Sequence, residues 1–149
     1  MAATLILALV GLTACTGSPA TLALRPDFVM TTSLGTASVS IRQSPPGMTD
    51  ATFARMVRTG MEAAMPGSAA PGPVTPPFPV HRIVWHVNPD ATPGVSRLVV
   101  NVFDGPTPVA VEQARVANGA AEGTLVNSIV SLTRQLAAAY AQLGSQAPA

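Results

Sequence analysis

Lysine is absent from this 149-residue chain, and most other side chains from which catalytic and metal sites are built are scarce. The chain has one cysteine, so an intramolecular disulfide is excluded. Charged residues make up 10% of the sequence and the net charge is +1, with no block of basic residues. This balance gives no electrostatic basis for nucleic-acid binding.

The two histidines and the acidic residues do not form a recognisable site. His81 and His86 are five residues apart, so in an extended strand they point to opposite faces and cannot bind one metal ion together. The carboxylates occur singly, without the spacing of a metal site, and neither a Gly-x-Ser-x-Gly motif nor a phosphate-binding glycine loop is present. We therefore expect no enzyme, no metal and no cofactor.

An apolar run, MAATLILALVGLTA, occupies residues 1–14 and precedes the cysteine. As a helix this run would span about 20 Å, which is shorter than the hydrocarbon core of a bilayer at about 30 Å. Its length is typical of the hydrophobic region of a secretory signal peptide. We therefore predict that residues 1–14 are a signal peptide.

The residues around Cys15 strengthen this interpretation. Leu12 stands three places before Cys15, with the small residues Thr13 and Ala14 between them. This stretch resembles the lipobox of bacterial lipoproteins. The resemblance implies cleavage before Cys15, lipidation of its sulfur and anchoring in the cell envelope. In that family an aspartate after the cysteine favours the inner membrane, so Thr16 favours the periplasmic side of the outer membrane.

The rest of the chain is long enough for one domain. Residues 15–33 contain prolines and no sustained hydrophobic period, and we predict a tether there. From residue 34 the apolar residues Ala37, Val39 and Ile41 alternate with polar ones, which predicts a strand. We therefore predict a single domain over residues 34–145.

The next elements follow from hydrophobic period and from proline. Apolar residues recur at helical spacing over 49–65, after a predicted N-cap at Thr49 or Asp50. Six prolines in residues 66–79 predict an extended surface connection, because proline donates no backbone hydrogen bond. Residues 80–88 and 96–104 alternate like two strands of a hairpin.

Two interpretations remain open for the last third of the chain. Residues 107–143 would form one helix of about 54 Å, or else a strand over 108–117 followed by a helix from a Thr124 cap to Leu143, with Gly144 after its end. The second interpretation is favoured, because the long helix exceeds the width of such a domain.

Together these elements predict an α+β two-layer sandwich in the order β-α-β-β-β-α. Its four-stranded, mostly antiparallel sheet would carry two helices on one face. Trp85 would lie under the helices as part of the core. The other face would carry the residues that we predict to bind a partner: Arg42, Arg82, His86, Asn101 and Phe103.

A lipobox, a tether and this order of elements resemble the auxiliary lipoproteins of Gram-negative envelope transport. Examples are the plug lipoprotein of the lipopolysaccharide translocon and the lipoproteins of phospholipid-trafficking systems. The resemblance implies a non-catalytic domain that binds an envelope protein complex. The alternative is a carrier of a lipid or another apolar ligand, held between sheet and helices against the methionines Met56, Met61 and Met65.

Overall fold

The computed structural model describes residues 26–32, 35–70 and 74–146. The predicted signal peptide and Cys15 lie outside these residues, as do the side chains of Tyr140 and Leu143. In chain order the elements are β1 (Phe28–Thr32), β2 (Gly35–Gln43), α3 (Asp50–Ala64), β3 (His81–Pro89), β4 (Val95–Asp104), β5 (Thr107–Ala117) and α4 (Glu122–Gln146). The predicted α+β class is confirmed.

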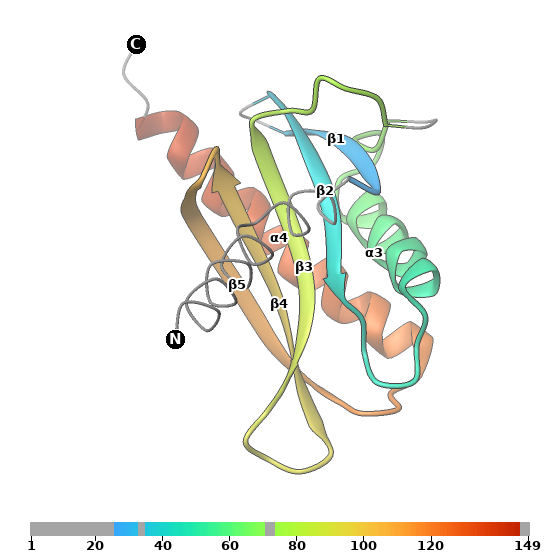
Figure 1. Cartoon of the computed structure of the whole chain (residues 1–149). Helices are drawn as coiled ribbons and strands as arrows, with labels where there is room; N and C mark the ends of the chain where they lie inside the picture. Colours follow the sequence, from blue (N-terminus) through green and yellow to red (C-terminus); the bar gives the residue numbers. More distant parts are fainter. Residues whose placement is uncertain (1–25, 33–34, 71–73, 147–149) are drawn as a thin grey trace, which may run out of the picture.

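The sheet has five strands in the order β1-β2-β3-β4-β5 (Figure 1). Three of its four pairings are antiparallel, and the pairing of β2 with β3 is parallel. A parallel pair needs a long crossover connection, which α3 and the proline-rich segment after it supply here. The prediction of four strands was wrong by one, because β1 had been placed in the tether.

Strand β1 lies within residues 15–33, for which the sequence predicted a tether. Phe28 and Met30 point into the core and are 2% and 0% exposed. On its outer side β1 forms two backbone hydrogen bonds of 2.8 Å to residues 68–70. Two alternating apolar residues beside a proline are too weak a pattern to predict a strand. The segment is a strand because it forms backbone hydrogen bonds on both sides.

Helix α3 forms as predicted, and its N-cap is Thr49. The Thr49 hydroxyl accepts a hydrogen bond from the backbone amide of Thr52 (3.2 Å), which satisfies one of the free donors of the first turn. The apolar stripe of the helix faces the sheet, with Phe53, Met56 and Met61 all 0% exposed. The strongest helical pattern in the sequence therefore led to a correct element.

The last third of the chain is a strand followed by a helix, so the single long helix was the wrong alternative. Strand β5 pairs with β4 along its whole length after a turn at Gly105, where φ is 59°. Helix α4 starts at Glu122 rather than after a Thr124 cap, and it passes the predicted end at Gly144. Neither α3 nor α4 is long and apolar enough to cross a membrane.

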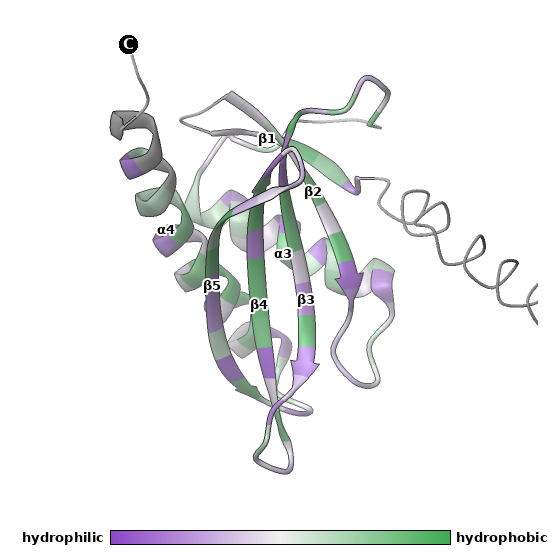
Figure 2. Ribbon diagram, turned by 60° about the vertical axis from the view of Figure 1, so that its left-hand side comes forward, coloured by the Kyte–Doolittle hydropathy of each residue, from purple (hydrophilic) through white to green (hydrophobic). Residues whose placement is uncertain are grey.

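The two helices pack against the same face of the sheet, side by side (Figure 1). Between the layers lie the buried side chains of both, including Val39, Ile83, Trp85, Leu98, Val100, Ile129 and Leu132. Trp85 is 0% exposed, and within the described part of the chain its Nε1 has no hydrogen-bond partner. Figure 2 shows the alternation of apolar and polar residues along β3, β4 and β5 that makes this core possible.

Candidate functional site

The face of the sheet opposite α3 and α4, here called the open face, carries all five residues that were predicted to bind a partner. Strand register and alternation assign these side chains to it: Ser38, Ser40, Arg42, Gln43, Arg82, Val84, His86, Arg97, Val99, Asn101, Phe103, Val111, Gln113 and Arg115. The predicted residues form two groups, one near the start of β3 and one in its second half.

The first group joins β3 to β4. Arg82 lies opposite Phe103 in the register, and the Cζ of its guanidinium sits 4.8 Å from the centre of the Phe103 ring. The same guanidinium donates a hydrogen bond to the carbonyl of Gly105 (3.2 Å). Stacking and hydrogen bonding together hold the guanidinium in one orientation and leave some of its five donors for another molecule.

The second group lies four residues further along β3. The side-chain amide nitrogen of Asn101 lies 3.0 Å from Nε2 of His86, within hydrogen-bond distance. A β-bulge at Arg42 places two consecutive residues of β2 opposite His86. Arg42, Gln43 and His86 consequently line a depression of about 310 Å³.

Two valines of the open face lie among these groups. Val84 lies between Arg82 and His86 along β3, and Val99 lies opposite His86 on β4; they are only 3% and 7% exposed. Val111, on the neighbouring edge strand β5, is 58% exposed. A recessed apolar centre with arginines, an aromatic ring and amides around it is the composition found at protein interfaces.

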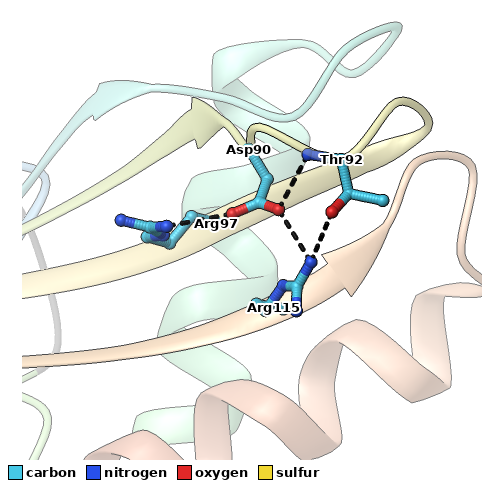
Figure 3. Close-up of polar contacts among 4 residues, drawn as sticks. All are labelled: Asp90, Thr92, Arg97 and Arg115. Atoms are coloured by element: carbon cyan, nitrogen blue, oxygen red, sulfur yellow. Dashed lines mark hydrogen bonds and ion pairs between the residues drawn. The ribbon is translucent and has the colours of Figure 1, made fainter.

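The end of the open face near the β3–β4 hairpin is fixed by Asp90 (Figure 3). Its carboxylate accepts hydrogen bonds from the amide of Thr92 (3.1 Å), from Arg97 (3.0 Å) and from Arg115 (2.9 Å). The Asp90 side chain is only 4% exposed. The Thr92 amide and then the two arginines lower the pKa of Asp90 from 3.8 to about 2, although burial opposes the shift. The cluster ties the hairpin to β4 and β5.

A cavity of about 340 Å³ lies beside this hairpin, at the carboxyl ends of β2 and β3. Its polar lining comprises Gln43, Ser44, Asn88, Asp90, Thr92, Ser96 and Asn118. Asp90 is the carboxylate among them, and its oxygens already bind two arginines. This lining offers hydrogen bonds but no activated nucleophile and no acid–base pair.

Residues 26–32, 35–70 and 74–146 contain no group of three histidine, cysteine, aspartate or glutamate side chains close enough together to hold a metal ion. The strand register places His81 and His86 on opposite faces of β3, as their spacing predicted.

Four residues that shape this surface were not predicted from the sequence: Asp90, Arg97, Val111 and Arg115. Alternation along 96–104 places Arg97 on the same face as Asn101, so the sequence pattern was sufficient to predict the position of Arg97. Val111 and Arg115 depend on the register of β5 with β4, including its irregularity at Val102 and Phe103, which the sequence does not reveal.

Comparison with known proteins gives no match to this chain, neither among family models nor among curated proteins nor among solved structures. The class that the fold defines is an α+β domain with a five-stranded mixed sheet and two helices.

Proposed function

We propose that this protein is a lipid-anchored, non-catalytic domain of the bacterial cell envelope that binds an envelope protein through the open face. The observation that carries the proposal is the gathering of Arg42, Arg82, His86, Asn101 and Phe103 on the sheet face away from the helices. Arginine and aromatic residues around a recessed apolar centre fit a protein partner better than a small substrate.

The anchoring half of the proposal comes from the sequence. The lipobox at residues 12–15 supports lipid attachment at Cys15 and a place on the periplasmic side of the outer membrane. Acyl chains contribute about 0.8 kcal/mol for each buried methylene, so two or more chains on one residue give a stable anchor. Such an anchor would confine the open face to the layer next to the membrane.

Intact-mass analysis tests the anchor. The protein is purified from the membrane fraction of a bacterial host beside a Cys15→Ala variant. We expect the mass of a chain that begins at Cys15 and carries acyl groups, and we expect this species to be missing from the variant. A full-length, unmodified mass would remove the anchor from the proposal.

Site-specific photocrosslinking tests the binding surface. A photoreactive p-benzoylphenylalanine replaces Val111, which is exposed on the open face, and in a matched control it replaces Gln135 on the exposed side of α4. We expect a discrete crosslinked product in cells from position 111 and none of the same size from position 135. Equal products from both positions, or none from position 111, would contradict binding through the open face.

The alternative of an apolar-ligand carrier has less support. Its methionines Met56 and Met61 are 0% exposed and belong to the packed core between sheet and helices, while the cavities of about 340 and 310 Å³ adjoin polar residues elsewhere. Organic extraction of the purified protein and mass spectrometry would revive the carrier if they recovered a stoichiometric lipid beyond the acyl groups on Cys15.

A further inference from the structure

Charge is distributed unevenly between the two sides of the sheet. Among the described residues, four of the seven arginines lie on the open face: Arg42, Arg82, Arg97 and Arg115. The helices carry the other three, Arg55, Arg58 and Arg134, together with the carboxylates Asp50, Glu62 and Glu122. On the two helices three arginines are therefore balanced by three carboxylates.

The open face lacks this balance. None of the described residues assigned to it carries a carboxylate, and Asp90, at its hairpin end, is bound by Arg97 and Arg115. Within the described part of the chain neither Arg42 nor Arg82 forms an ion pair with a carboxylate, and Arg82 is instead stacked on Phe103. Two of the four guanidinium groups are thus available to an external anion.

These two cations mark the ends of the site. Arg82 lies at one end, and Arg42 lies beside His86 at the other. Arg82 and His86 are four residues apart in one strand, so about 13 Å separates their backbones along β3, and Arg42 lies across from His86 on β2. The recessed Val84 lies between Arg82 and His86 along β3. An extended peptide covers the same distance between residues i and i+4.

We propose that the open face binds an extended acidic protein segment that presents one carboxylate to Arg82 and another to Arg42. This inference rests on the proposed function and names the chemistry of its partner. The planar guanidinium matches a carboxylate in a bidentate manner, and the apolar centre receives the side chains between the two acids.

The orientation of the arginines favours a protein over an anionic membrane. Arg82 is held against Phe103 and the carbonyl of Gly105, and Arg97 and Arg115 are held against Asp90. Three of the four arginines are therefore fixed at the sheet, whereas binding to lipid headgroups draws on basic side chains that extend freely into the interface.

Two labelled peptides test the proposal by fluorescence anisotropy with the lipidated protein in non-ionic detergent. One is an extended threonine- and valine-rich peptide with glutamates at positions i and i+4, and the other has glutamines at the same positions. The variant Arg42→Gln/Arg82→Gln is compared with Arg55→Gln/Arg134→Gln, which removes the same charge from the helical side. Circular dichroism shows that each variant is folded.

We expect the glutamate peptide to bind more tightly than the glutamine peptide, and the open-face variant to weaken its binding about tenfold. The helical-side variant should change the affinity for the glutamate peptide less than twofold, and added salt should weaken the binding of this peptide. Equal binding of both peptides, or equal losses in both variants, would overturn the proposal. So would binding of the protein to phosphatidylglycerol vesicles that depends on Arg42 and Arg82 when the peptide does not bind.

The crosslink from position 111 distinguishes a failure of the acidic-segment proposal from a failure of the proposed function. If it persists in the Arg42→Gln/Arg82→Gln background, the open face binds a partner and the acidic chemistry is wrong. If the unmodified face gives no crosslink at all, the proposed function fails whatever the peptides do. If the crosslink is present and is lost only with the open-face pair, both proposals stand.

Discussion

The two faces of the sheet are built from the same strands and have opposite environments. On the covered face Ile83 and Trp85 of β3 are 0% exposed beneath the helices. On the open face the neighbouring side chains Arg82 and His86 are partly exposed and hydrogen-bond to other polar groups. The difference shows that one strand sequence with period two specifies both a buried core and a polar, partly exposed face.

The faces also differ in what holds them together. The covered face depends on apolar burial between close-packed side chains, in which any change of volume is costly. The open face depends on a few directed contacts, such as the stacking of Arg82 on Phe103 and the cluster around Asp90. We therefore expect substitutions on the covered face to lower stability more than those on the open face.

The largest expected loss of stability is that of Trp85→Ala on the covered face, which we compare with a substitution of its neighbour His86 on the open face. Trp85→Ala should lower the free energy of unfolding by about 3 to 5 kcal/mol, because it leaves a cavity in the core. His86→Ala removes one hydrogen bond on the open face and should cost about 1 kcal/mol or less. Urea unfolding followed by circular dichroism measures both. Comparable losses would show that the two faces do not differ in this way.

A smaller effect is expected where the helices touch. A Cβ at Gly60 of α3 would lie 2.5 Å from Cγ2 of Ile129 in α4, so Gly60→Ala should cost about 1 to 3 kcal/mol. Gly123→Ala is the matched control in α4, because no atom lies within 4 Å of its added Cβ. It should be neutral or stabilise by up to about 1 kcal/mol through helix propensity. Thermal unfolding of the two variants measures both effects. An undiminished stability of Gly60→Ala would contradict close packing of α3 against α4 at this position.

The smallest effect concerns the carboxylate at the end of the open face. The pKa of Asp90 is about 2 in the folded protein and 3.8 ordinarily, so on acidification the unfolded chain takes up the proton first. Its stabilising contribution is complete above about pH 4 and is lost as the pH falls towards 2. Asp90→Asn should lower the melting temperature at pH 7 and flatten the decline between pH 4 and 2. An unchanged pH profile would show that the cluster does not contribute to stability.

The elements differ in how far the sequence predicted them. Helix α3 and strands β2, β3 and β4 have strong patterns and were found, because each has at least three apolar residues in its own period. Strand β1 was missed, since it is defined by its pairing with β2 and with residues 68–70 and not by a pattern of its own. The end of α4 was placed too early, because one glycine in an otherwise favourable sequence does not stop a helix.

The candidate site also contains features that the sequence predicted and features that it did not. Alternation along single strands was sufficient to assign Arg82, His86, Asn101 and Phe103 to one face. It was not sufficient to pair Arg82 with Phe103, or to bring Arg97 and Arg115 to Asp90, because these contacts depend on register between strands. The cluster around Asp90 joins residues up to 25 positions apart.

The sequence alone therefore determined the α+β class, the helical and extended segments and the face of each strand to which a residue belongs, because hydrophobic period and turn residues act locally. Only the tertiary structure decided the fifth strand, the parallel pairing of β2 with β3 and the concentration of arginines on the open face. These features arise from contacts between distant segments, whose register is fixed when the whole sheet buries its apolar face against the helices.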